Sequence, residues 1–157
     1  MLPFNEDFRE LLSCLLDADV RFLVIGAYAV AFHGYVRATK DIDLWVKADP
    51  ENAKRAFRAL TLFGAPLDGV EPGDLLDPET VLQIGLPPRR VDILSEIEGV
   101  QFDDAWRRRE QSDLDGLLVP VLGLDDLIEA KRATNRSQDR ADVEALERIR
   151  SLADGER

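Results

Sequence analysis

The sequence predicts an α/β (α+β) fold in which helices flank a small, mixed and twisted sheet, and three observations support this class. Short apolar runs of strand length recur along the chain, for example at 22–25 and 91–94. Segments with helical spacing of apolar residues lie between such runs, beginning with residues 8–16. Glycine and proline mark the boundaries of these segments. Because the chain has 157 residues and no repeat, we expect one domain, 1–157.

The elements can be assigned in order from periodicity and from helix-start and helix-stop residues. They are a helix near 8–16, a strand at 22–25, a short helix at 27–33, a strand at 41–46, a helix at 50–63, strands at 81–84 and 90–94, a helix at 102–109, an extended segment at 117–122, and a C-terminal helix pair at 124–134 and 138–152. Residues 64–78 hold three prolines and three glycines, which predicts a long loop. Pro120 has no N–H for a sheet ladder, so segment 117–122 is expected at a sheet edge.

Composition limits the classes of protein. Apolar residues make up 45% of the chain without a membrane-length run, and the N-terminus lacks a signal-peptide layout, so a soluble cytoplasmic protein without a membrane partner is expected. The only cysteine, Cys14, excludes an internal disulfide. The net charge of −11 opposes an extended grip on nucleic acid. Cations cluster at 107–109 and 131–136, and for 107–109 a solvated surface is the expected arrangement.

The stretch from Phe22 to Lys47 carries the chemistry. Side chains alternate along a strand, so Asp41 and Asp43 project to the same side, roughly 7 Å apart at their α-carbons. Two such carboxylates repel each other unless a cation lies between them. Oxygen ligands on a rigid strand suit Mg²⁺ or Mn²⁺, and Asp92 on a later strand is a third candidate ligand. The alternative is a solvated pair on an acidic surface.

Features around the two aspartates suggest an anion site as well. Gly26 permits close backbone approach where a buried strand meets a helix N-terminus, which favours binding of an anion. Arg37 and Lys40 lie just before the carboxylates, where they would meet phosphate oxygens. His33 ends the short helix and is expected to be a packed or capping residue rather than a catalytic base.

These residues resemble a known family. Gly26-Ala27, thirteen further residues, Asp41-Ile42-Asp43-Leu44 and a later Val91-Asp92-Ile93 are similar to the signature of the DNA polymerase β-like nucleotidyltransferase superfamily. The pattern Gly-x-x-Ala…His-Gly…Arg-x-Thr-x-Asp-Ile-Asp-Leu resembles the small bacterial AbiEii-type (abortive-infection) nucleotidyltransferase toxins. The chain departs from the superfamily at Ala27, where glycine or serine is usual, so a hydroxyl that could bind phosphate is missing.

The resemblance implies a minimal nucleotidyltransferase fold and assigns roles by position. Asp41, Asp43 and Asp92 would be catalytic and would hold two Mg²⁺ or Mn²⁺ ions, with Asp92 able to take the proton of the acceptor. The nucleoside triphosphate would be bound by Gly26, Ala27, Arg37, Thr39, Lys40 and Lys131. For Lys131, pairing with a nearby carboxylate is the competing arrangement.

The resemblance leaves the acceptor and the partners open. The acceptor could be an RNA or tRNA 3′ end, a protein side chain or a small molecule, and a toxin would have a cognate antitoxin protein. Two alternatives to an active enzyme also stand. One is a catalytically weak relative that binds nucleotide or a partner protein, which Ala27 and the acidic surface favour. The other is an unrelated α/β domain with surface carboxylates.

Overall fold

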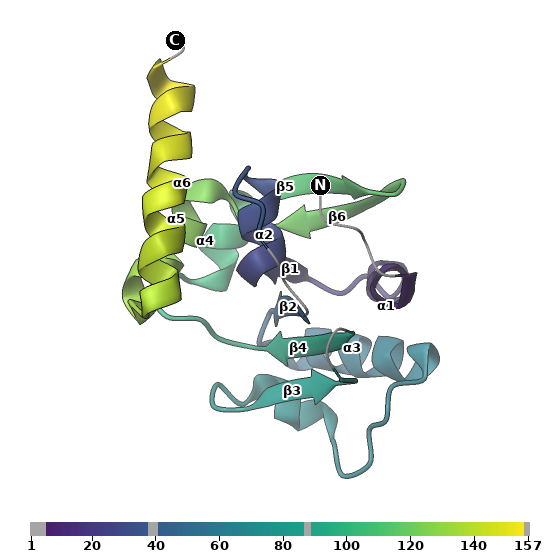
Figure 1. The fold of residues 1–157 in the computed structure, drawn as a ribbon. Helices are drawn as coiled ribbons and strands as arrows, with labels where there is room; N and C mark the ends of the chain where they lie inside the picture. Colours follow the sequence, from purple (N-terminus) through teal and green to yellow (C-terminus); the bar gives the residue numbers. More distant parts are fainter. Residues whose placement is uncertain (1–5, 38–40, 87–88, 156–157) are drawn as a thin grey trace.

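A computed structural model describes residues 6–37, 41–86 and 89–155. It contains a six-stranded mixed sheet with flanking helices, which confirms the expected fold class (Figure 1). The strands are β1 (Phe22–Ile25), β2 (Asp41–Val46), β3 (Val81–Ile84), β4 (Arg90–Leu94), β5 (Glu110–Leu114) and β6 (Leu117–Val121). The helices are α1 (Glu6–Asp17), α2 (Gly26–Phe32), α3 (Pro50–Phe63), α4 (Phe102–Arg107), α5 (Leu124–Thr134) and α6 (Ser137–Gly155). No described helix is both long enough and apolar enough to cross a membrane.

The sheet is built around β1 and β2, in the strand order β3-β4-β2-β1-β6-β5. β2 pairs antiparallel with β1 and parallel with β4, so it lies in the interior of the sheet. All four residues of β1 are buried, as expected for a continuous apolar run. β1 therefore lies at the centre of the fold, and the chain leaves its C-terminal end directly into α2.

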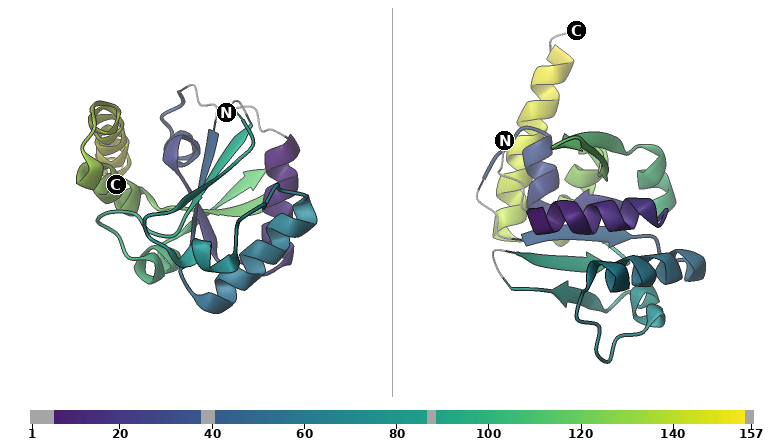
Figure 2. Two further views of the ribbon diagram at one scale, coloured as in Figure 1. Left: turned by 90° about the horizontal axis from the view of Figure 1, so that it is seen from below. Right: turned by 90° about the vertical axis from the view of Figure 1, so that its right-hand side faces the viewer.

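The sheet has helices on both faces. Helices α1 and α3 pack against each other on one side, whereas α6 lies on the other (Figure 2). The core contains buried side chains from the strands and from the helices, among them Ile42, Leu44, Leu12 and Leu60. Helix α3 begins and ends as its sequence predicts, because the Asp49 side chain accepts a hydrogen bond from the N–H of Asn52 and Gly64 ends the helix in the left-handed region.

Three details differ from the sequence expectation. Segment 117–122 is not an edge strand: β6 lies between β1 and β5, and its pairing with β1 is confined to Val121 and Leu122, just after Pro120. The missing N–H of Pro120 therefore does not interrupt that ladder. Residues 110–114, for which no element was expected, form the edge strand β5. The predicted loop 64–78 contains a short 3₁₀ helix, η1 (Pro72–Leu76).

Candidate functional site

The three aspartates predicted from the sequence lie on one face of adjacent strands. In the parallel β2–β4 pair, Asp43 is directly opposite Asp92, and Asp41 is directly opposite Arg90. Neighbouring strands lie about 4.8 Å apart, and residues in register point to the same face. Four ionisable side chains, three acidic and one basic, therefore form a small rectangle on the sheet.

Arg90 occupies the middle of this group. Its Nη2 lies 2.8 Å from Oδ2 of Asp41, and its Nε lies 3.1 Å from Oδ1 of Asp92. An arginine does not lose its charge, so it supplies the cation that clustered carboxylates require. Among the described residues, no three metal-binding side chains form a ready metal site.

Asp43 differs from the other two carboxylates because it forms no ion pair within the described residues. The pKa of Asp43 is raised from 3.8 to about 6, first by burial and then by the nearby charges of Asp92 and Asp41, which together outweigh the lowering effect of Lys131 and Arg90. The ionised form of Asp43 is therefore strained in the free protein. A cation bound beside Asp43 would therefore stabilise its ionised form.

Gly26 is required by its close contact with Asp43. Its φ is +68°, and a Cβ atom at this position would lie 2.1 Å from Oδ2 of Asp43. Any other residue would need both a left-handed backbone and a displaced carboxylate. The backbone at Gly26 therefore lies against the Asp43 carboxylate, and the buried Ala27 lines the same cavity.

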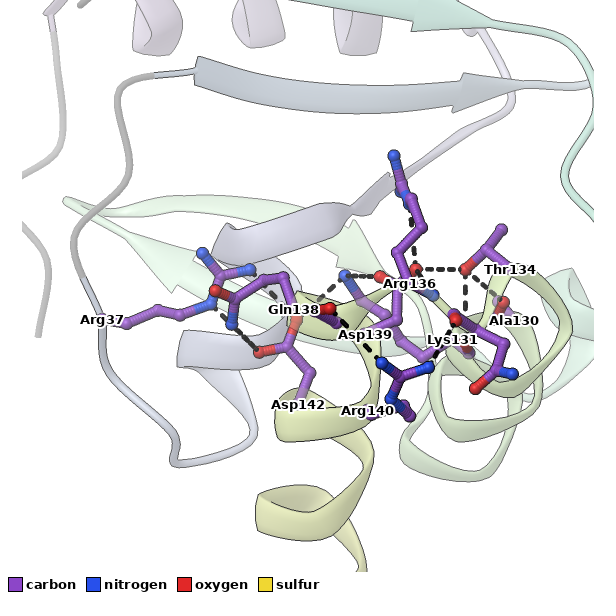
Figure 3. A network of polar contacts seen from close by, with 11 residues as sticks. Arg37, Ala130, Lys131, Thr134, Arg136, Gln138, Asp139, Arg140 and Asp142 are labelled. Atoms are coloured by element: carbon purple, nitrogen blue, oxygen red, sulfur yellow. Dashed lines mark hydrogen bonds and ion pairs between the residues drawn. The ribbon is translucent and has the colours of Figure 1, made fainter.

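Two of the predicted phosphate-binding cations, Arg37 and Lys131, share one buried carboxylate (Figure 3). Arg37 donates two hydrogen bonds of 3.1 Å to the fully buried Asp142 on α6. Nζ of Lys131 lies 3.1 Å from Asp142 and 3.5 Å from Asp139. Lys131 thus pairs with nearby carboxylates in this structure, and its contact with substrate remains a prediction.

Asp139 holds the turn between α5 and α6. Its Oδ2 accepts hydrogen bonds from the Thr134 hydroxyl at 2.6 Å and from the N–H and Nε of Arg136 (Figure 3). Burial alone would raise the pKa of Asp139, but these hydrogen bonds outweigh it and lower the pKa to about 2. Asp139 therefore stays ionised in the turn between α5 and α6 and lines the cavity beside the sheet.

One cavity of about 420 Å³ brings these groups together. It is lined by Gly26, Ala27, Arg37, Asp41, Asp43, Arg90, Asp92, Lys131, Arg136, Gln138 and Asp139. Thr39 and Lys40, also predicted to bind nucleotide, lie outside the described residues. Residues of α5, of α6 and of the turn between them form one wall of this cavity.

Sequence reasoning missed Arg90, Arg136 and Gln138. A signal was present for Arg90, which alternates with Asp92 along β4 and so must share its face. A second cavity of about 330 Å³ shares five residues with the first, and most of the rest of its surface is apolar, with Leu94 and Leu127 among the lining side chains. The shared residues are Gly26, Asp43, Lys131, Arg136 and Asp139.

His33 has the packed role that its position suggested. Its ring is nearly buried, and Nε2 lies 2.8 Å from the carbonyl oxygen of Leu122. Since a carbonyl only accepts, Nε2 carries the proton and donates it in this bond. Nδ1 lies 3.5 Å from Glu110. His33 does not line the carboxylate cavity.

The fold is that of the nucleotidyltransferases, as comparison with solved structures shows. A lincosamide antibiotic adenylyltransferase, LnuA, in its lincomycin-bound form matches with a TM-score of 0.61 at 13% identity, over 93% of this chain and 98% of that chain. A Thermotoga maritima protein assigned as a nucleotidyltransferase matches with a TM-score of 0.57 at 17% identity, over 94% and 91%. The antibiotic-resistance factor ANT(2'')-Ia matches with a TM-score of 0.54 at 12% identity, over 96% and 90%.

The sequence itself places the chain in a family. Residues 3–153 match the model of a nucleotidyltransferase family of unknown function, DUF6036, and the chain belongs to that family. Comparison with curated proteins finds no match. The assignment agrees with the superfamily resemblance and with the transferase class, which the family and the solved structures both support.

Proposed function

We propose that this protein transfers a nucleoside monophosphate from a nucleoside triphosphate to an acceptor hydroxyl. The observation that carries the proposal is the β2–β4 register, which aligns Asp43 with Asp92 and leaves Asp41 on the same face. Membership of a nucleotidyltransferase family supports the same reaction class. In this reaction the acceptor oxygen forms a bond to the α-phosphorus, the bond to the β-phosphate oxygen breaks, and pyrophosphate leaves.

The donor set fits divalent metal. Asp41, Asp43 and Asp92 offer carboxylate oxygens on rigid strands, and the raised pKa of Asp43 marks a place where negative charge lacks compensation. Mg²⁺ or Mn²⁺ held by these three side chains would supply charge neutralisation for the phosphates and activation of the acceptor hydroxyl. Because Arg90 contacts Asp41 and Asp92, we infer that it moves away when the carboxylates turn to such an ion.

The remaining residues of the cavity bind and orient the substrates. The N–H groups of Gly26 and Ala27, which line the cavity, would bind phosphate oxygens, and Arg37 and Lys131 would add positive charge. The apolar cavity that continues from Gly26 and Asp43 suits the nucleoside. Asp92 would take the proton of the acceptor hydroxyl as the new bond forms.

Three observations favour a small hydroxyl-bearing molecule as the acceptor. LnuA is a lincosamide adenylyltransferase, ANT(2'')-Ia has been described with adenylyl-2''-tobramycin, and this chain spans most of both. The net charge of −11 also disfavours a polynucleotide acceptor. An AbiEii-type toxin with an RNA or tRNA acceptor, a cognate antitoxin and a cytoplasmic location is the alternative that the motif Arg-x-Thr-x-Asp-Ile-Asp-Leu supports.

The test is transfer of label from each α-labelled nucleoside triphosphate in the presence of Mg²⁺ or Mn²⁺. Acceptors are offered in three separate arms: a panel of small polyols and aminoglycosides, pooled RNA, and total cell protein. We expect label in the small-molecule arm with the wild type and none with Asp43→Asn. Label in the RNA arm would support the toxin alternative. Stabilisation by nucleotide and metal without labelling in any arm would instead identify a catalytically weak nucleotide-binding relative.

A further inference from the structure

A second charged cavity lies away from the carboxylates. It has a volume of about 430 Å³ and is lined by residues from α1, β1, α3, α4, β5 and β6 or from the segments beside them. Its charged lining residues are Arg21, Arg55, Arg109 and Asp19, and Trp106 forms part of its wall. We call it the arginine cavity.

The three arginines line one cavity, and within the described residues none of them has a carboxylate partner. The two arginines that precede Arg109 are paired by contrast: Arg107 with Asp104 and Arg108 with the buried Asp126. Within the described residues, Arg21, Arg55 and Arg109 form no ion pair with a carboxylate. Three guanidinium charges and one Asp19 carboxylate leave a net charge of +2 on the lining (3 − 1 = 2).

Arg21 and Arg109 are also held by contacts that do not neutralise their charge. The backbone of Arg21 exchanges hydrogen bonds with the buried Asn52 side chain, at 2.8 and 3.0 Å. Arg109 lies over the Trp106 ring, 4.0 Å from its centre, and donates from Nη1 to the Trp106 carbonyl at 2.7 Å. Its Nε is buried and has no hydrogen-bond acceptor among the described residues. Trp106 is itself stacked on Phe102.

The arginine cavity is separate from the carboxylate site. Arg21 precedes β1 and Gly26 follows it, so the two sites lie at opposite ends of that strand, roughly 15 Å apart along its axis. The two cavities share no lining residue. Arg55 and Arg109 are half-buried and Arg21 is exposed, and like charges gathered around one cavity repel each other, so an anion bound there would relieve their repulsion.

We propose that the arginine cavity binds a phosphate group. Guanidinium forks match phosphate oxygens in a bidentate manner, and the net charge of +2 matches a doubly ionised phosphate better than a single carboxylate. The phosphate comes either from a free polyphosphate or nucleotide, or from the backbone of a polynucleotide. This site is independent of the proposed transfer chemistry, because none of its residues belongs to the carboxylate cavity.

The experiment uses Trp106 as a local reporter, since Trp45, the other tryptophan, lies outside the arginine cavity. The full chain, in EDTA at low ionic strength, is titrated with sodium pyrophosphate and separately with a short single-stranded RNA while tryptophan emission is recorded. We expect saturable binding, and a dissociation constant about tenfold weaker in Arg109→Gln and in Arg55→Gln. Trp106→Phe should abolish the emission change.

Arg107→Gln is the matched control, because it removes the same charge two residues away, from a side chain that is paired with Asp104 and does not line the cavity. Its affinity should equal that of the wild type, and melting curves confirm that each variant is folded. Saturation by pyrophosphate assigns the site to free phosphates, whereas saturation by RNA alone assigns it to a polynucleotide backbone. Equal weakening in Arg107→Gln and Arg109→Gln, or no saturable binding of either probe, would overturn the proposal. Metal-dependent labelling tests the proposed transfer separately.

Discussion

Asp43 is a carboxylate whose surroundings favour its neutral form. It is partly buried, faces Asp92 across the strand pair and touches the backbone at Gly26. Asp41 and Asp92 share the charge of Arg90, but Asp43 does not. Replacing one of these four residues at a time therefore distinguishes the effect of repulsion among the carboxylates from the effect of metal binding.

Asp43→Asn should abolish transfer and raise the stability of the metal-free protein at pH 7.5 by about 1–2 kcal/mol, because a neutral amide removes the unfavourable charge. The increase in melting temperature caused by millimolar Mg²⁺ or Mn²⁺ should shrink, since a ligand is lost. Melting curves with EDTA and with metal measure both effects. Asp68→Asn, at an exposed carboxylate, is the control and should change neither. Identical metal shifts in the wild type and Asp43→Asn would contradict a metal site here.

Arg90→Gln should have the opposite effect on metal-free stability and increase the response to metal. Without the guanidinium, the repulsion among the three carboxylates is uncompensated, and unfolding should become easier by about 1–2 kcal/mol. A cation would no longer compete with Arg90, so Mn²⁺ should bind more tightly in calorimetric titration without nucleotide. Arg89→Gln removes an exposed charge from the preceding residue and should leave the Mn²⁺ affinity unchanged. Weaker Mn²⁺ binding in Arg90→Gln would show that Arg90 supports the ion instead of competing with it.

Ala27→Ser should leave transfer activity equal or higher, because it adds a hydroxyl beside the proposed phosphate site with little added volume. The measurement is kcat/KM for the nucleoside triphosphate. Ala31→Ser, in the same helix but outside the cavity, should leave kcat/KM unchanged. A large loss of activity in a folded Ala27→Ser protein would place the phosphates elsewhere.

At the scale of elements, Asp142 connects three parts of the chain. It receives Arg37 from the segment after α2, Lys131 from α5, and a 3.0 Å hydrogen bond from Gln138 in its own helix. Burial would raise the pKa of Asp142, but the hydrogen bonds from Arg37, Lys131 and Gln138 lower it overall. This carboxylate thus fixes the helix pair relative to the sheet and holds two cations beside the proposed substrate cavity.

Asp142→Asn should reduce the free energy of unfolding by about 2–4 kcal/mol, because it leaves two partly buried cations without their shared partner. Urea denaturation measures the change. Glu144→Gln on the same helix breaks an exposed pair with Arg148 and should cost no more than about 0.5 kcal/mol. A change in Asp142→Asn as small as that of the control would show that the network does not hold α6 in place.

For the whole molecule, the shifted carboxylates predict the pH dependence of stability without metal. The pKa of Asp139 is lowered from 3.8 to about 2, so its stabilisation is complete above pH 3.8 and is lost as the pH falls toward 2. The pKa of Asp43 is raised from 3.8 to about 6, so the folded state loses stability as the pH rises from 3.8 to 6. We therefore expect the highest stability at about pH 4–5 in EDTA, measured by urea denaturation across pH.

Two comparisons test the assignment of this pH profile to Asp43. In Asp43→Asn the decline between about pH 4 and 6 should be absent, and at pH below 4 the variant and the wild type should be equally stable. Saturating Mn²⁺ should also remove the decline in the wild type, because the ion replaces the proton as the compensating charge. A profile that declines equally in the variant would assign the effect to other groups.

The sequence by itself determined the features that depend on local geometry. Alternation along a strand put Asp41 and Asp43 on one side, and the apolar run at 22–25 identified a strand buried on both faces. The predicted helix range 50–63 matches α3, whose ends are fixed by the Asp49 cap and by Gly64. Each of these depends on residues a few positions apart, so the relevant physics is contained in a short segment.

Only the tertiary structure decided which groups meet across the chain. Strand order put β6 inside the sheet despite Pro120, because a proline affects only the ladder in which its own N–H would take part. The partners of long side chains depend on their rotamers and on which groups the fold brings near them. Arg90 lies between two carboxylates, Lys131 contacts Asp142, and Arg109 lies over the Trp106 ring. Such pairings depend on the packing of elements distant in sequence, and local patterns contain no information about that packing.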